Sequence, residues 1–280
     1  DAELGDRAAT DAAFAAARHV VELTLVNNRV VNAQMEPRAA VAEVEKSGRH
    51  VLHTGSQGVR RHAAMLAAMF GLATSQVRVL CRDVGGGFGP RNFLYAEFVL
   101  VLWAARRLGR PVKWTSDRTD SFVSDVQARD LVTDAALALD GDGKFLAMRV
   151  RLTGNVGAHT VSYVPLANGS RLISTVYAVP AAHVVVRGVL TNTLPTGPYR
   201  GAGRPEAQLM MERLIERAAQ QLGIDGVELR RRNLVPQAAM PWTNPTGLIY
   251  DSGTFAANMD RALARADRDG FAARRTASQA

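Results

Sequence analysis

The spacing of hydrophobic positions predicts alternating strands and helices in the first part of the chain. Residues 19–26, HVVELTLV, alternate between apolar and polar positions as a half-buried strand does. Downstream, short apolar runs of strand length alternate with longer, helix-length apolar segments. The predicted order is strand and loop 50–57, helix 58–70, strand 77–84, helix 93–109 and strand 111–116. This order is typical of a mixed α/β beginning.

The second half of the chain has a different pattern. The apolar stretches on either side of the DGDG sequence at 140–143 predict a hairpin, because Asp-Gly supplies the positive φ values of a tight turn. A strand is predicted at 181–192. A long helix is predicted at 205–222, with Pro205 in its first turn and Gly223 as its stop.

The remaining segments complete an α+β fold with mixed sheets and packed helices. A shorter helix is predicted at 225–236, and the last thirty residues are expected to form an Ala- and Arg-rich helix that frays at TASQA. We find no internal repeat. The 280 residues are expected to form one domain, with two lobes divided near residues 120–130 as one possible arrangement.

Composition and charge argue against several kinds of site. The net charge of +8 comes from arginines that are scattered and not interleaved with aromatic residues, so a nucleic-acid surface is disfavoured. Cys81 is the single cysteine and the histidines show no HxxxH or HxH spacing, so no zinc or iron site made by protein ligands is expected. Any metal would arrive already ligated. No apolar run reaches transmembrane length and the first residues lack a signal pattern, so we expect a cytoplasmic protein.

A glycine-rich loop, DVGGGFGPR at 83–91, follows a predicted strand. It does not match the GxGxxG dinucleotide fingerprint, because Pro90 takes the third glycine position, and no GK[ST] follows for a phosphate-binding P-loop. Two interpretations remain open. The loop is either a tight strand-to-helix turn packed under Phe88 or a nest of backbone N–H groups for an anionic or sulfur-bearing ligand.

Two further loops carry polar side chains among small residues. In PTGPYRGAGRPEA at 195–207, Arg200 lies between glycine-containing segments just before a helix N-terminus, where it can donate two hydrogen bonds to an anion. An exposed arginine in a Pro/Gly turn is the alternative. In TGSQG at 54–58, Gln57 precedes a helix, and by itself it is typical of a helix start.

The combination of these loops resembles the molybdenum-binding large subunit of the xanthine dehydrogenase, aldehyde oxidase and aerobic carbon monoxide dehydrogenase family. The resemblance rests on MEPRA at 35–39, HTGSQGV at 53–59, VRVLCRDVGGGFG at 77–89, PYRGAGRPEA at 198–207 and RRNLVP at 231–236. It covers nearly the whole chain. Residues 1–280 would then be the first molybdenum-cofactor-binding domain, and a second cofactor domain is absent from the sequence.

The resemblance implies a molybdenum–molybdopterin cofactor, expected in its cytosine dinucleotide form, with no direct protein ligand to the metal. It implies that Gln57 hydrogen-bonds a ligand of the metal, and that Gly86, Gly87, Phe88 and Gly89 form the loop against the metal centre. It also implies that Arg200 orients substrate and cofactor. Partners implied by the family are a second cofactor domain or subunit, an iron–sulfur subunit with a [2Fe–2S] cluster and a flavin subunit with FAD.

The residues predicted to line the substrate pocket depart from two branches of the family. The carbon monoxide branch has a copper-binding cysteine after the arginine, where this chain has Gly201. The xanthine branch has a phenylalanine two places after the arginine and an acid four places after Phe88, where this chain has Ala202 and Asn92. Together with Tyr199, these residues leave room for an aldehyde or another aromatic heterocycle as the small-molecule substrate.

The family's general base is a glutamate near the end of the large subunit, in the second domain. Glu97, Glu206 and Glu212 are not its equivalents, and we expect them to be caps or solvated helix positions. We therefore predict that this chain is part of a molybdenum hydroxylase, as a natural split subunit or an excised piece, and that it is inactive alone. The alternatives are a non-catalytic scaffold of the same fold that has lost the cofactor and, further off, a nucleotide- or RNA-binding domain.

Overall fold

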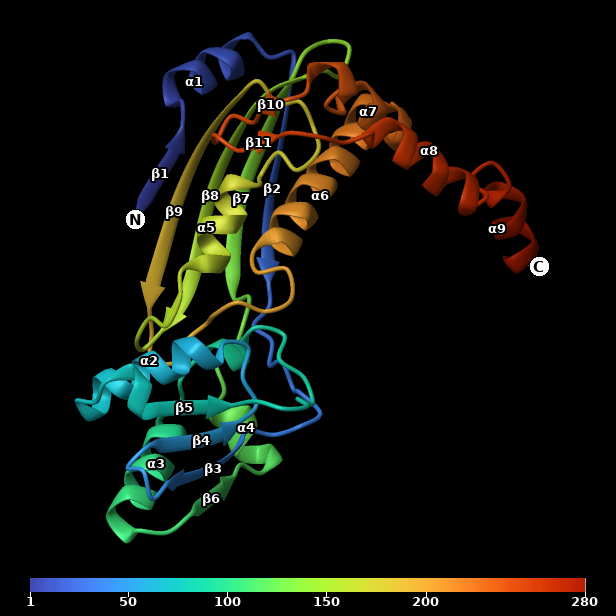
Figure 1. The fold of residues 1–280 in the computed structure, drawn as a ribbon. Helices are drawn as coiled ribbons and strands as arrows, with labels where there is room; N and C mark the ends of the chain where they lie inside the picture. Colours follow the sequence, from blue (N-terminus) through green and yellow to red (C-terminus); the bar gives the residue numbers. More distant parts are fainter. Residues whose placement is uncertain (280) are drawn as a thin grey trace.

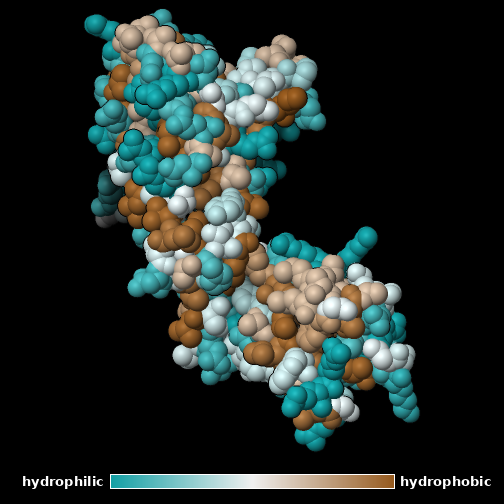
Figure 2. Space-filling view, turned by 90° about the vertical axis from the view of Figure 1, so that its left-hand side faces the viewer, coloured by the Kyte–Doolittle hydropathy of each residue, from teal (hydrophilic) through white to brown (hydrophobic). Residues whose placement is uncertain are grey.

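Two β-sheets, each with its own hydrophobic core, organise residues 1–279, which are the residues that this computed structural model describes (Figure 1). The larger sheet and its helices form the upper part of the molecule in this view, and the smaller lobe lies below it. The outline narrows where the two parts join, and apolar residues gather there on the face shown in Figure 2. The predicted mixture of sheets with packed helices is confirmed.

The larger sheet has the strand order β1-β9-β8-β7-β2, so segments from both halves of the chain build it. Its strands are β1 (Ala2–Gly5), β2 (His19–Asn27), β7 (Leu131–Leu139), β8 (Phe145–Gly157) and β9 (Ala181–Leu190). β8 and β9 are parallel, and the other neighbours are antiparallel. As expected, the turn at Asp140–Gly143 joins β7 to β8, with Gly143 at φ 80°.

The long helix α6 (Arg204–Leu222) covers the larger sheet. It places Met210, Met211, Leu214 and Ile215 in one core cluster with side chains of β7 and β8. Burying an aliphatic side chain of this size contributes about 1.5–3 kcal/mol, so this face fixes the helix on the sheet. Two helices pack against α6, namely α5 (Val164–Arg171) and α7 (Gly226–Asn233), and α1 (Arg7–Ala16) packs against β8 and β9.

The smaller lobe is built on a four-stranded sheet with the order β5-β4-β3-β6. Its elements are β3 (Ala39–Val44), β4 (His50–Thr54), α2 (Val59–Phe70), β5 (Val77–Leu80), α3 (Ala96–Leu108), β6 (Val112–Thr115) and α4 (Arg118–Ser124), with short 3₁₀ turns at Thr74–Gln76 and Pro90–Asn92. β4 and β5 are parallel because α2 crosses between them. Leu52, Leu66, Phe98 and Leu102 fill the core between the sheet and its helices.

The two lobes are not successive in sequence. Residues 19–27, which precede the smaller lobe, pair with residues 131–139, which follow it. The chain therefore enters and leaves the smaller lobe through two connections. A domain division near residues 120–130 stays a prediction.

The C-terminal segment extends away from the larger sheet (Figure 1). After a 3₁₀ turn at Gln237–Ala239 and a small ribbon, β10 (Trp242–Thr243) and β11 (Ile249–Tyr250), the chain forms α8 (Phe255–Arg265) and α9 (Phe271–Gln279). The prediction of one helix with a frayed end is wrong, because Asp267 at φ 45° breaks the helix and the last turn of α9 includes Gln279. Ala280 lies outside the described residues.

Candidate functional site

The three loops predicted from the sequence meet where the two lobes join. The loop at 85–89 follows β5, Gln57 follows β4, and the segment 198–203 leads into α6 from the other lobe. The Arg200 N–H donates to the carbonyl oxygen of Phe88 over 2.9 Å and ties the two lobes together at this point.

Gln57 is bound to the glycine loop through its side-chain oxygen. Oε1 accepts from the Gly89 N–H at 2.8 Å, and the Gln57 N–H donates to the Arg91 carbonyl oxygen at 3.0 Å. The side chain is exposed, and the structure gives its Nε2 no acceptor among residues 1–279. The amide donor of Gln57 is therefore available to a bound molecule.

Arg200 lies over the aromatic ring of Phe88. The guanidinium carbon is 4.7 Å from the ring centroid, within the range of a cation–π interaction. Phe88 adopts φ 53°, a strained value for a residue with a side chain, and it is 40% exposed. The backbone of Phe88 is therefore strained, and this conformation presents a large apolar ring and an arginine together at the surface. Such a combination is typical of a functional loop.

The glycines of the loop are required by its packing against the other loops. A Cβ at Gly87 would lie 2.8 Å from the Gln57 side chain, and one at Gly89 would lie 1.9 Å from the Pro198 carbonyl oxygen. Gly86, at φ 111°, would place its Cβ 2.8 Å from the Phe88 ring. The missing side chains therefore let three segments of backbone come together, whatever the loop binds.

Three successive backbone N–H groups of this loop, at residues 86–88, have no acceptor among the described residues. Their neighbours do have acceptors, because Gly85 donates to Glu36 and Gly89 donates to Gln57. Consecutive unpaired N–H groups in a glycine-rich turn are typical of anion-binding nests. Together with Gln57 Nε2 and the Arg200 guanidinium, they form a set made of hydrogen-bond donors.

Arg129 and Glu206 support the Arg200 loop, and sequence reasoning missed both roles. Arg129 donates to Glu206 at 2.8 Å and to the Arg200 carbonyl oxygen at 3.0 Å, and its guanidinium lies 5.1 Å from the centroid of the Tyr199 ring. Glu206 is 5% exposed in the first turn of α6. No sequence signal distinguishes such a buried ion pair from two surface charges.

The expectation that Glu97, Glu206 and Glu212 are caps or solvated positions is wrong. Glu97 pairs with the buried Arg38 at 2.5 Å, and Glu212 accepts from the Tyr177 hydroxyl and from Arg230, each at 2.7 Å. These carboxylates are structural partners of buried or half-buried donors. Helical spacing alone cannot show this, because the partners are distant in sequence.

His62 on α2 connects the Gln57 loop to the end of the glycine loop. Its Nδ1 lies 3.1 Å from Ser56 Oγ and its Nε2 lies 3.2 Å from the Asn92 carbonyl oxygen. Burial lowers the pKa of His62. The neutral ring can donate from Nε2 and accept at Nδ1, which matches these two partners.

The four residues predicted to line a substrate pocket lie in two separate segments, with Asn92 just after the glycine loop and Tyr199, Gly201 and Ala202 before α6. Tyr199 lies under Arg129, as described above, whereas Asn92 is half-buried and its N–H donates to the Gly89 carbonyl oxygen at 3.0 Å. Gly201 and Ala202 form the turn into α6, with φ values of 88° and 45°. The structure brings Tyr199 and Asn92 next to the glycine loop, and the substrate role of all four residues stays a prediction.

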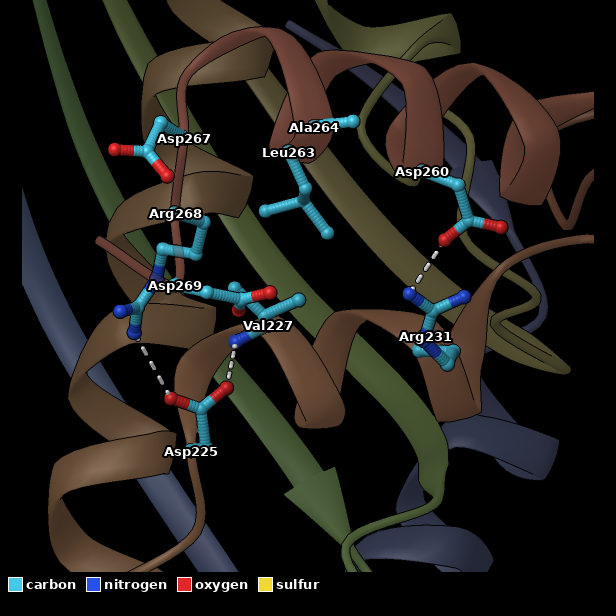
Figure 3. A pocket seen from close by; sticks show the side chains of 9 residues that line it. All are labelled: Asp225, Val227, Arg231, Asp260, Leu263, Ala264, Asp267, Arg268 and Asp269. Carbon is cyan, nitrogen blue, oxygen red and sulfur yellow. Dashed lines mark hydrogen bonds and ion pairs between the residues drawn. The ribbon is translucent and has the colours of Figure 1, made fainter. Parts of the chain in front are cut away.

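A cavity of about 550 Å³ between α7 and α8 contains none of the predicted site residues (Figure 3). Four of its charged side chains form two ion pairs: Arg231 with Asp260 at 2.6 Å, and Arg268 with Asp225 at 3.3 Å. Asp225 also caps α7 by accepting from the Val227 N–H. These contacts give four of the charged side chains structural partners, and the cavity lacks every predicted site residue, so we place the candidate site at the three loops.

Residues 1–279 contain no group of three or more His, Cys, Asp or Glu side chains placed to hold a metal ion. Within the same residues, no helix is long and apolar enough to span a bilayer.

Comparison with known proteins gives consistent matches. Residues 1–234 match the family described as the molybdopterin cofactor-binding domain. Subunit gamma of the 6-hydroxypseudooxynicotine dehydrogenase complex of Paenarthrobacter nicotinovorans is 34% identical over 264 residues, which cover 92% of this chain and 33% of that protein. The carbon monoxide dehydrogenase large chain of Hydrogenophaga pseudoflava is 34% identical, over 99% of this chain and 35% of that protein.

Solved structures agree with these matches. The structure of quinoline 2-oxidoreductase from Pseudomonas putida 86 superposes with a TM-score of 0.93 at 33% identity and covers 99% of this chain and 36% of that one. The chain spans about a third of the length of the curated relatives named here.

Proposed function

Because this chain belongs to the molybdopterin cofactor-binding domain family, we propose that its glycine loop, Gln57 and Arg200 hold a molybdenum–molybdopterin cofactor in a hydroxylating oxidoreductase. The observation that carries the proposal is the convergence of three loops on one set of donors: Gln57 Oε1 fixes Gly89, and Arg200 binds the Phe88 carbonyl and covers its ring. In such an enzyme the molybdenum, held by the pterin dithiolene, supplies two-electron redox chemistry at the substrate.

The donor set of this site fits such a cofactor. The open N–H groups at residues 86–88 and the amide of Gln57 can bind oxygen or sulfur atoms that carry negative charge. Arg200 adds a guanidinium group with a full positive charge. A metal that is already ligated by its pterin needs only such surrounding donors. The cytosine dinucleotide form of the cofactor is part of this proposal.

The substrate that we propose is an aldehyde or an aromatic heterocycle. Gly201 stands directly after Arg200, and a Cβ there would lie 2.7 Å from the Pro205 ring at a φ of 88°. A cysteine at this position would therefore strain the turn, which disfavours a copper-dependent oxidation of carbon monoxide. The relatives named for 6-hydroxypseudooxynicotine and quinoline act on heterocyclic compounds, in keeping with this substrate class.

The remaining parts of the reaction are proposed to lie on partners. The general base would be a glutamate of a second cofactor domain, and electrons would leave through a [2Fe–2S] cluster and FAD on further subunits or domains. The complex is proposed to act in the cytoplasm. Within this chain, Gln57 and Arg200 would orient the bound molecules, and Phe88 would exclude water from one side.

The test is the substitution Arg200→Ala in the assembled enzyme. One charged donor at a reacting site is often worth about 10²-fold in turnover, so we expect kcat to fall at least about tenfold while the molybdenum content stays high. Arg217→Ala is the matched control, because Arg217 is exposed on the same lobe-covering helix, α6. Unchanged kinetics in Arg200→Ala with full molybdenum content would remove Arg200 from the proposal.

A further inference from the structure

Arg91 is a buried arginine two residues after the end of the glycine loop. It is 2% exposed, and its Nη2 donates to the Glu36 carbonyl oxygen at 2.5 Å. Nε and Nη1 are buried and have no partner among residues 1–279, and no carboxylate of these residues lies within ion-pair distance of the guanidinium. Such open donors on a buried charge are costly and call for an explanation.

The nearby Arg38 shows how this lobe satisfies a buried arginine. Arg38 is 1% exposed and pairs with Asp125 and Glu97, each at 2.5 Å, and its guanidinium also lies 4.0 Å from the centroid of the Tyr95 ring. Asp125, a carboxylate whose charge also acts on Arg91, is thereby engaged by Arg38. Arg91 consequently has a main-chain carbonyl as its hydrogen-bond partner.

That carbonyl belongs to Glu36, which holds the beginning of the glycine loop. The Gly85 N–H donates to Glu36 Oε2 at 2.7 Å, and the Glu36 N–H donates to the Gly85 carbonyl oxygen at 3.1 Å. A Cβ at Gly85 would lie 2.5 Å from the Glu36 Cβ, so the two residues are in tight contact. Glu36 therefore fixes Gly85 by two hydrogen bonds, and Arg91 fixes Glu36.

Arg91 also reaches the other end of the loop. Its carbonyl oxygen accepts from the Gln57 N–H at 3.0 Å, and Gln57 in turn accepts from the Gly89 N–H at 2.8 Å. One buried residue thus connects both hydrogen bonds that frame the open N–H groups at 86–88. Burial lowers the pKa of Arg91, yet an arginine remains protonated, so its side-chain bond to Glu36 carries a positive charge.

We propose that Arg91 is a positioning residue for the cofactor-binding loop: through Glu36 on one side and Gln57 on the other, it holds the loop at 85–89 in the shape that presents its N–H groups. This inference rests on the proposed cofactor function. The guanidinium of Arg91 binds Glu36, which holds Gly85, and a positive charge in this part of the lobe favours a negatively charged ligand at the loop. A shorter or uncharged side chain would leave Glu36 free to turn away from Gly85.

The test compares Arg91→Met, Arg91→Lys and Glu36→Gln in the assembled complex. The readouts are amide hydrogen exchange of peptides that cover residues 84–90 and the molybdenum retained per complex after dialysis. Val101→Ala is the control for a general loss of stability, because Val101 is 5% exposed in the core of the same lobe and does not touch the loop.

We expect exchange at the amide of Gly85 to accelerate about tenfold or more in Arg91→Met, which is the effect of losing one hydrogen bond to a charged donor. The amide of Gly89 should change less, because Gln57 is bound to the main-chain carbonyl of Arg91, which the substitution keeps. Molybdenum should be lost faster on dialysis. Arg91→Lys should restore both readouts in part, because it keeps the charge and one donor, and Glu36→Gln should reproduce the faster exchange at Gly85. Val101→Ala should lower the thermal midpoint and change neither readout.

Slow exchange and full molybdenum retention in Arg91→Met would overturn the positioning role. The same role would be overturned if Val101→Ala changed both readouts as much as Arg91→Met does. If the wild-type complex contains no molybdenum, the proposed function fails, and the exchange experiment still decides whether Arg91 holds the loop. If Arg91→Met does not fold, Arg91→Lys decides by the same two readouts, because it changes the donor to the Glu36 carbonyl oxygen, and wild-type exchange and retention in it would overturn the role.

Discussion

At the scale of single residues, the site depends on backbone conformations that few side chains allow. Phe88 and Ala202 adopt positive φ values, and the loop glycines lie where a Cβ would meet another loop. The sequence predicted the residues of these loops because glycines around one large side chain are an unusual pattern. It could not predict the roles of Glu36, Arg91 or Arg129, because a charged residue that will be buried or half-buried looks the same in sequence as one on the surface.

Gly89→Ala tests the close approach of the loops. Gly89 has φ 123° and faces the Pro198 carbonyl oxygen, whereas Gly71 has φ 64° and open space around its Cβ position. Backbone strain alone costs about 1–2 kcal/mol, so Gly71→Ala should lower the free energy of unfolding by about this amount and leave the cofactor in place. Gly89→Ala should cost more and should also displace Arg200, with loss of bound molybdenum.

Chemical denaturation and metal analysis of the two variants check this prediction. Equal losses of stability in both, with full molybdenum content in Gly89→Ala, would mean that the Gly89–Pro198 contact does not matter for the site.

At the scale of elements, the sequence predicts most helices and strands and the hairpin of β7 with β8, but not the pairing of strands that are distant in sequence. Helix 205–222 was clear because Pro205 and Gly223 mark its ends, and the structure places it at Arg204–Leu222. The partners of β2 and the parallel pairing of β8 with β9 were not predicted, since they join residues far apart in sequence. Pairing depends on which apolar faces meet in the folded chain, and no local pattern encodes that.

The helix α2 and the strand β4 give the smaller lobe a sensitivity to acid. Burial lowers the pKa of both His50 and His62 below the ordinary histidine value of 6.5. The unfolded chain therefore binds protons at these sites more readily than the folded chain. The stability that they contribute is fully present above pH 6.5 and is lost as the pH falls from there toward the lower pKa values of the folded state.

Thermal denaturation between pH 8 and pH 5 checks this prediction. The midpoint temperature of unfolding should decrease as the pH drops below about 6.5. His62→Gln should make this decrease shallower, because the amide can still donate to the Asn92 carbonyl oxygen and does not titrate. His159→Gln is the control, since His159 is exposed in the larger lobe. The same decline in His62→Gln and wild type would argue against a contribution from His62.

At the scale of the whole molecule, the candidate site lies between two cores that are stabilised separately. Gln57 and the glycine loop belong to the smaller lobe, and Arg200 belongs to the larger one. The resemblance to molybdenum-binding large subunits was visible in the sequence because its motifs lie in these loops, and the family match and the solved structures confirm it. The joining of the lobes at the Arg200–Phe88 hydrogen bond was visible only in the structure.

The central claim is that this chain holds a molybdenum–molybdopterin cofactor at the three loops. The most direct test is the molybdenum and pterin content of the complex purified with its partners, for the wild type and for Gly89→Ala. We predict about one molybdenum and one pterin per copy of this chain in the wild type, as expected for a single cofactor site, and a clear loss of both in Gly89→Ala. A folded wild-type complex with neither molybdenum nor pterin would contradict the claim and would favour a scaffold that has lost the cofactor.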